Sequence, residues 1–225
     1  MKILQVIIAV FVLNPIFAQV KTYDTLPNLL DHYTKRCKLF ESEPIVKGKI
    51  MMVGNSITEG GNWKTLLQDS AVINRGISGD VTFGVLNRIR DIADRQPSKL
   101  FLLIGVNDLS RNTPDDLIIE NILMIITRIR VSSPNTEIYL QSILPTNDNF
   151  KNLFKAFIGK GAHIRKINEE LKKYGSVLKY TYVDLYSNFQ DADGNMDARY
   201  SSDGLHLNQA GYSHWVEVLK NGKYL

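Results

Sequence analysis

The chain has 225 residues, of which 44% are apolar and 22% are charged, and its formal net charge is +4. This length and apolar content suit one globular α/β domain with a substantial core. The Lys and Arg residues are scattered among acids, as on a solvated surface, so the charge gives no support for a nucleic-acid partner and we expect none.

The first 18 residues are typical of a signal peptide. Lys2 gives a short positive region, residues 3–13 form an apolar stretch interrupted only by Gln5, and Ala18 is a small residue at a cleavage point before Gln19. The apolar stretch is short for a membrane span and no stop-transfer pattern follows, although an uncleaved anchor is the alternative. No Cys follows Ala18, so we expect no lipoprotein anchor. We predict export to the periplasm or the extracellular medium, without stable membrane insertion after cleavage.

Residues 19–47 are expected to form a lead-in that packs on the main domain. Its apolar face would comprise Tyr23, Leu29, Leu30, Tyr33 and Phe40. The segment also holds Cys37, the only cysteine, so an intrachain disulfide cannot form and stability must come from the core. We expect Cys37 to be a small, partly buried residue.

Residues 48–225 alternate between short apolar runs and amphipathic segments, and we interpret them as a single domain. The expected strands are residues 50–53, 71–75, 99–104, 136–143 and 180–185. The expected helices begin after Asn62, span residues 81–93, begin at Pro114, span residues 163–174 and begin near Asn208. Such alternation predicts a parallel sheet with helices on both faces, and five strands fit a flavodoxin-like order, 2-1-3-4-5.

Ser56 follows the first strand in Gly54-Asn55-Ser56, where small and polar residues end an apolar run. The loop at the carboxyl end of a parallel strand is where ligands bind in such sheets. A serine placed there can act as a nucleophile if a base reaches it and N–H groups face the reacting oxygen. The alternative is that Ser56 caps the next helix.

Asp203 and His206 lie three residues apart after the last strand. In a turn, this spacing places both side chains on one side, so the carboxylate can hold Nδ1–H and leave Nε2 to take the Ser56 proton. The alternative is that Asp203 caps the final helix and His206 is a packing residue.

Gly79 and Asn107 follow the second and third strands and could stabilise an oxyanion. The Gly79 N–H is open to close approach because the residue has no side chain, and the Asn107 amide can donate. Each residue taken alone is equally typical of turns.

Four blocks in order resemble the SGNH hydrolase (GDSL-like esterase/lipase) family. They are Gly54-Asn55-Ser56, Asn74-Arg75-Gly76-Ile77-Ser78-Gly79-Asp80, Gly105-Val106-Asn107-Asp108 and Asp203-Gly204-Leu205-His206-Leu207. The resemblance covers about residues 48 to 220. It implies a three-layer α/β/α sandwich, with Ser56 as nucleophile, His206 as base and Asp203 as its orienting acid. It also implies an oxyanion hole formed by the N–H groups of Ser56 and Gly79 with the Asn107 side chain.

The first block departs from the usual Gly-Asp-Ser of the family, since Asn55 occupies the middle position. No catalytic part is lost by this change. Thr58 stands where a Gly-x-Ser-x-Gly elbow needs its last glycine, which argues against an α/β-hydrolase. The blocks are most similar to the branch containing platelet-activating-factor acetylhydrolase-like and sialate O-acetylesterase-like proteins.

We therefore predict an exported serine esterase that acts on small-molecule or carbohydrate esters, with short acyl groups such as acetyl, and needs no metal or organic cofactor. The alternatives are a lysophospholipase or thioesterase using the same residues, or a non-catalytic carbohydrate-binding module.

The loop Asp191-Ala192-Asp193-Gly194-Asn195-Met196-Asp197 resembles the start of a calcium loop, but Ser202 stands where the twelfth-position Glu belongs. We interpret it as a polar turn.

Overall fold

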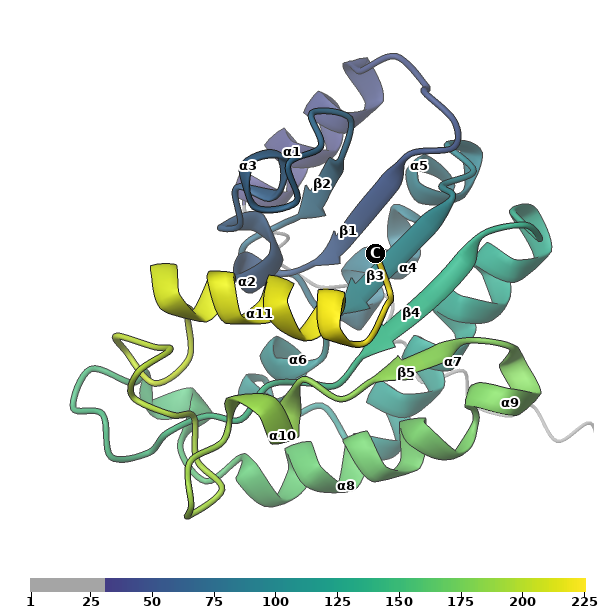
Figure 1. The fold of residues 1–225 in the computed structure, drawn as a ribbon. Coiled ribbons are helices and arrows are strands. Elements are labelled where there is room, and N and C mark those ends of the chain that lie inside the picture. The colour runs from purple at the N-terminus through teal and green to yellow at the C-terminus, as the bar shows by residue number, and fades with distance from the viewer. Residues whose placement is uncertain (1–30) are drawn as a thin grey trace, which may run out of the picture.

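The computed structural model describes residues 31–225, which form a five-stranded parallel sheet with helices around it (Figure 1). The strand order is β2-β1-β3-β4-β5, so the predicted fold and the order 2-1-3-4-5 are confirmed. The strands are β1 (Ile50–Gly54), β2 (Ile73–Gly76), β3 (Lys99–Leu103), β4 (Glu137–Gln141) and β5 (Thr181–Val183). The expected signal peptide and the apolar residues Tyr23, Leu29 and Leu30 lie outside the described residues.

Helices cover both faces of the sheet. They are α1 (Asp31–Ser42), α2 (Ser56–Glu59), α3 (Trp63–Leu66), α4 (Thr82–Asn87), α5 (Ile89–Asp94), α6 (Val106–Ser110), α7 (Asp115–Ser132), α8 (Gly161–Lys173), α9 (Gly175–Leu178), α10 (Tyr186–Phe189) and α11 (Gln209–Asn221), with the 3-10 turn η1 (Lys155–Phe157). Helix α11 lies in front of the sheet, whereas α4, α5 and α7 lie behind it (Figure 1). No helix within residues 31–225 is long and apolar enough to cross a membrane.

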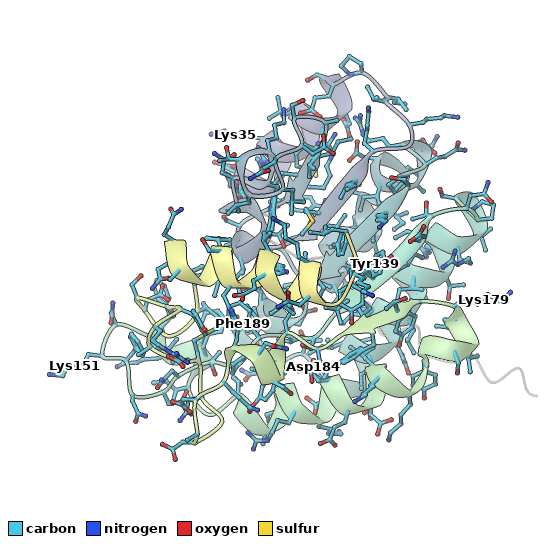
Figure 2. All side chains as sticks on the ribbon, viewed as in Figure 1. Lys35, Tyr139, Lys151, Lys179, Asp184 and Phe189 are labelled. Atoms are coloured by element: carbon cyan, nitrogen blue, oxygen red, sulfur yellow. The ribbon has the colours of Figure 1, made fainter. Side chains whose placement is uncertain are left out.

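Aromatic side chains hold α11 to the rest of the domain. Trp215 meets Trp63 of α3 edge to face, with ring centroids 4.8 Å apart, and its indole N–H donates to Gln141 Oε1 at 2.6 Å. Phe189 of α10 is buried beside α11, where its ring contacts His214 (Figure 2). These contacts fix the helix that follows the His206 loop, as edge-to-face aromatic pairs do in cores.

The prediction of a single helix over residues 81–93 is wrong, because the structure has two helices, α4 and α5, that meet at Arg88. Arg88 has φ −105° and ψ 19° at the junction. Its buried guanidinium donates to Asp80 Oδ2 and to the Gly54 carbonyl oxygen. The spacing of the apolar residues continues unchanged across Arg88, so apolar periodicity does not reveal a break that is caused by a buried ion pair.

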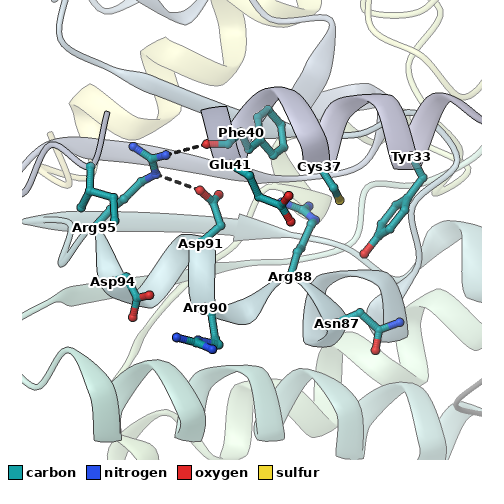
Figure 3. A pocket seen from close by; sticks show the side chains of 11 residues that line it. Tyr33, Cys37, Phe40, Glu41, Asn87, Arg88, Arg90, Asp91, Asp94 and Arg95 are labelled. Carbon is teal, nitrogen blue, oxygen red and sulfur yellow. Dashed lines mark hydrogen bonds and ion pairs between the residues drawn. The ribbon is translucent and has the colours of Figure 1, made fainter. Parts of the chain in front are cut away.

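Helix α1 packs against the strand-β2 side of the domain. Tyr33 and Phe40 are buried with Ile77, and the Tyr33 hydroxyl donates to the Gly84 carbonyl oxygen at 2.7 Å. Arg95 Nη2 donates to the Phe40 carbonyl oxygen at 2.8 Å, which ties the end of α1 to the end of α5 (Figure 3). The described part of the lead-in is therefore a helix anchored to the domain at both ends.

Candidate active site

Ser56 begins α2 directly after β1. A Cβ at Gly54 would lie 2.3 Å from the Leu103 carbonyl oxygen, so only glycine lets the chain leave the sheet this close to β3. Asn55 Oδ1 accepts a hydrogen bond from the Ile57 N–H at 2.9 Å and caps α2. The capping role that the sequence allowed for Ser56 belongs to Asn55, and the Ser56 hydroxyl is left for another partner.

That partner is His206. Ser56 Oγ lies 3.0 Å from His206 Nε2, and His206 Nδ1 lies 2.7 Å from Asp203 Oδ2. The final helix takes its N-terminal cap from Asn208, which accepts from the Gly211 N–H, so Asp203 is not that cap. The three side chains form one hydrogen-bonded chain from hydroxyl to imidazole to carboxylate, the arrangement in which an imidazole can remove the hydroxyl proton.

The Asp203 carboxylate is held by its own loop. Its Oδ1 accepts from the backbone N–H groups of Leu205 at 2.9 Å and His206 at 2.7 Å. Partial burial alone would raise the pKa of the Asp203 carboxyl, but the hydrogen bonds from the His206 ring and from these two N–H groups outweigh it, so that pKa lies below its usual value. An ionised carboxylate can then orient the ring and stabilise an imidazolium.

The site is open to solvent. The side chains of His206 and Asp203 keep 38% and 25% of their accessible surface, and Ser56 is half-buried. The loop is nevertheless fixed, because Ser201 Oγ donates to the His206 carbonyl oxygen and accepts from the Gly204 N–H.

Gly79 lies in a tight turn at the end of β2. The Asp80 N–H donates to the Ile77 carbonyl oxygen at 3.0 Å, and Gly79 has φ +77°, as the third residue of a type II turn requires. Arg111 donates to the Gly79 carbonyl oxygen at 3.1 Å from the end of α6. A residue with a side chain would be strained at this positive φ, which explains why position 79 is a glycine.

Asn107 sits in the first turn of α6, next to this turn. One N–H of its amide donates to the Asp80 carbonyl oxygen at 2.9 Å, which leaves the second N–H to a ligand. Behind it, the buried Asp108 carboxyl accepts from the Thr82 N–H and hydroxyl. Burial raises the pKa of Asp108 to about 7, against the lowering effect of the Thr82 hydrogen bonds. The Asn107 amide is thus attached to the residue that directly follows Gly79, which fixes the relative positions of Gly79 and Asn107.

A model of the GDSL-like lipase/acylhydrolase family matches residues 52–214, a range that contains Ser56, Gly79, Asn107, Asp203 and His206. The chain belongs to this family of ester hydrolases. It is 32% identical to an arylesterase of Vibrio mimicus over 44% of this chain and 56% of that one, so the match spans about half the length of that relative. It is 25% identical to the platelet-activating factor acetylhydrolase IB subunit alpha2 of Rattus norvegicus over 73% of this chain and 71% of that one.

Among solved structures, the chain resembles that of a protein from Streptococcus pneumonia described as a putative platelet activating factor. The TM-score is 0.74 and the identity 30%, over 84% of this chain and 90% of that one. The resemblance to the GDSL-like family that the sequence blocks carry is therefore confirmed.

The sequence did not predict the contacts of two carboxylates beside the site, Asp80 and Glu59. Asp80 forms a buried ion pair with Arg88 at 2.9 Å directly after the Gly79 turn. Glu59 ends α2 and accepts hydrogen bonds from Ser78, while His32 of α1 lies 3.0 Å from it. The only sequence signal was position, since Asp80 and Glu59 stand inside or next to the family blocks.

The remaining histidines and the loop of residues 191–197 lie apart from the site. His163 is exposed and pairs with Asp115, whereas His214 contacts the Asn188 carbonyl oxygen. Asp191 Oδ1 accepts from the N–H groups of Asp193 and Asn195, which makes the calcium-like loop a turn closed by its own side chain. Within residues 31–225, no group of three or more His, Cys, Asp or Glu side chains is placed to hold a metal ion.

A pocket of about 530 Å³ lies elsewhere, between α1 and the helices α4 and α5 (Figure 3). Tyr33, Cys37 and Arg88 are among the residues that line it, and none of the five predicted site residues does. Burial raises the pKa of the half-buried Cys37 thiol, which disfavours the reactive thiolate.

Proposed function

We propose that this chain is an exported serine esterase that cleaves carboxylic esters through an acyl-serine intermediate. The observation that carries the proposal is the hydrogen-bonded chain Ser56–His206–Asp203, with distances of 3.0 and 2.7 Å, in an open site. Family membership supports ester hydrolysis as the chemical class. A carbohydrate-binding module would have no need for this chain of hydroxyl, imidazole and carboxylate.

In the proposed mechanism, His206 Nε2 takes the Ser56 proton as Oγ attacks the ester carbonyl carbon. The resulting oxyanion is stabilised by the N–H groups of Ser56 and Gly79 and by the free amide N–H of Asn107. His206 then gives its proton to the leaving alcohol, and the acyl group stays on Ser56. Water, deprotonated by His206, attacks the acyl-serine, and the acid leaves as Ser56 regains its proton.

We propose a short acyl group, in particular acetyl on a carbohydrate or a similar alcohol. The sequence contains no long apolar lid segment, and one relative at 25% identity is an acetylhydrolase. Export is proposed from the signal-like residues 1–18. It predicts that the full-length chain expressed in a bacterial host appears outside the cytoplasm with Gln19 at or near its N-terminus, which N-terminal sequencing would test.

A lipid-directed hydrolase is the second candidate, and one feature favours it. Phe154 and Ile158 are 64% and 50% exposed beside η1, and η1 contacts α6, the helix that carries Asn107. Exposed apolar side chains near the site are suited to a long acyl chain or a micelle surface.

The deciding experiment is hydrolysis of p-nitrophenyl acetate, butyrate and octanoate by the mature protein and by Ser56→Ala. We expect acetate to be cleaved fastest and the variant to lose at least about 10³-fold in kcat. Ser187→Ala, which removes a hydroxyl from α10, is the matched control and should keep the wild-type rate. Rates that rise with acyl length would favour the lipid-directed enzyme, whereas ligand binding by an inert wild type would favour the binding module.

A further inference from the structure

The Glu59 carboxylate connects the helix of the nucleophile to the turn of the oxyanion hole. Glu59 is the last residue of α2, which begins at Ser56. Its Oε2 accepts from both the backbone N–H and the hydroxyl of Ser78, each at 2.6 Å, and Ser78 directly precedes Gly79. A displacement of this carboxylate would therefore move the Gly79 N–H relative to Ser56 Oγ.

Helix α1 supplies two further partners of this carboxylate, an imidazole and a guanidinium. His32 Nε2 lies 3.0 Å from both Glu59 oxygens, and Arg36 Nε lies 3.2 Å from Oε1. Arg36 Nη2 also donates to the Gly76 carbonyl oxygen, three residues before Gly79. Hydrogen bonds to an ionised carboxylate are shorter and stronger than neutral ones, so the two that Oε2 accepts from Ser78, together with the contacts of His32 and Arg36, give a rigid attachment.

Glu59 is ionised in this arrangement. Its partial burial would raise the pKa of the carboxyl, but the hydrogen bonds from Ser78 and His32 outweigh that effect, so its pKa lies below the usual value. The bridge therefore joins a carboxylate to the guanidinium of Arg36 at neutral pH.

Helix α1 can hold this bridge because the helix is itself fixed. Tyr33 and Phe40 are buried, and the Tyr33 hydroxyl bonds to α4. The helix also lies before residue 52, where the match to the family model begins, so it adds a support that this match does not include.

We propose that His32, Arg36 and Glu59 act as positioning residues through which α1 fixes the Gly79 N–H relative to Ser56. The inference rests on the proposed function, because it concerns the oxyanion hole of that reaction. An oxyanion donor stabilises the transition state only when it lies about 2.7–3.1 Å from the developing charge, so a small displacement lowers kcat more than it changes KM.

The test compares Glu59→Gln and the double variant His32→Ala/Arg36→Ala with wild type on p-nitrophenyl acetate, with active sites titrated by a fluorophosphonate. We expect kcat to fall by about tenfold in each, because a donor is misplaced rather than removed, with KM within about twofold. Affinity for a phenylboronic acid, whose tetrahedral adduct on Ser56 places an oxygen in the oxyanion hole, should fall in parallel. Arg36→Lys, added to His32→Ala, restores a cation beside Glu59 and should recover part of the loss.

Lys35→Ala is the matched control, because Lys35 is exposed on α1, points away from the domain and makes no hydrogen bond or ion pair within the described residues (Figure 2). It should keep the kcat and boronate affinity of wild type. If Glu59→Gln does not fold, the double variant at the surface of α1 still tests the bridge.

Wild-type kcat and boronate affinity in a folded double variant would overturn the inference, and the loss of activity in Ser56→Ala would show that the proposed function stands regardless. Full activity of Ser56→Ala would instead overturn the proposed function itself.

Discussion

The two halves of the candidate active site are held in different ways. Asp203 and His206 lie in one short loop, and the N–H groups of that loop hold the carboxylate. Gly79 and Asn107 come from different segments, and they are held by hydrogen bonds from the exposed Arg111 to the Gly79 carbonyl oxygen and from Asn107 to the carbonyl oxygen of the buried Asp80. The proposed acid–base pair is thus a local structure, whereas the proposed oxyanion hole depends on tertiary contacts.

The largest loss of kcat should come from a change in the loop that holds Asp203 and His206. In Asp203→Asn, Oδ1 can still accept from the N–H groups of Leu205 and His206, so the loop should keep its shape. The amide holds the His206 ring in the wrong tautomer, and we expect kcat for p-nitrophenyl acetate to fall by about 10⁴-fold.

The matched control for this change is Asp197→Asn, which alters a carboxylate that pairs with Arg199 on the same polar segment. It should leave kcat near the wild-type value. A loss of less than tenfold in a folded Asp203→Asn would contradict the orienting role of Asp203.

The next effect concerns the oxyanion donor itself. Asn107→Ala removes the amide that we propose donates its second N–H to the oxyanion, and kcat should fall by about 10²–10³-fold with KM little changed. Asn188→Ala, which removes an exposed amide of α10 that donates to the Asp184 carbonyl oxygen, is the control. Equal kcat values for the two variants would show that Asn107 is not an oxyanion donor.

A smaller effect is expected from the tertiary support of Gly79. Arg111→Ala removes the donor to the Gly79 carbonyl oxygen, and the loss of one hydrogen bond should lower kcat by no more than about tenfold. Arg128→Ala on the exposed side of α7 serves as control. A loss as large as that of Asn107→Ala would mean that Arg111 contacts the substrate directly.

The smallest effect on rate, and a distinct effect on stability, should come from Asp108→Asn. Because the folded pKa of Asp108 is raised to about 7, the folded state binds the proton more tightly than the unfolded chain. Its stabilising contribution is full below about pH 4 and is lost as pH rises through 7. Urea unfolding at pH 5 and pH 8 should show a smaller decline in Asp108→Asn than in wild type.

The pKa of Asp203 is shifted in the opposite direction, so its contribution is present above about pH 4 and is lost as the pH falls through its lowered folded pKa. Urea unfolding of Asp203→Asn and wild type should therefore show different changes in the free energy of unfolding as the pH falls below about 4. An identical decline in wild type and Asp108→Asn between pH 5 and pH 8 would show that Asp108 ionises normally.

The sequence predicted the sheet well because each strand is a local apolar run. The five strands, their order and the carboxyl edge where Ser56, Gly79 and Asn107 meet follow from the alternation of strands and helices. The break between α4 and α5 was not predictable, because Arg88 is turned inwards by Asp80 and the apolar pattern continues past it. The catalytic roles of Ser56 and His206 stay predictions that the proposed assays test.

By itself, the sequence determined the family blocks, the fold class and the five candidate residues that follow strands at one edge of the sheet, because motif spacing and apolar periodicity are local properties of the chain. Only the tertiary structure decided that Asn55 rather than Ser56 caps α2, and that His32 and Arg36 of α1 hold Glu59 against the oxyanion turn. The contacts of His32 and Arg36 with Glu59 join segments more than 20 residues apart in the chain, and such partners are chosen by packing and burial, which no local pattern encodes. The Asn55 cap is local, but two neighbouring residues could have formed it, and the backbone geometry decided between them.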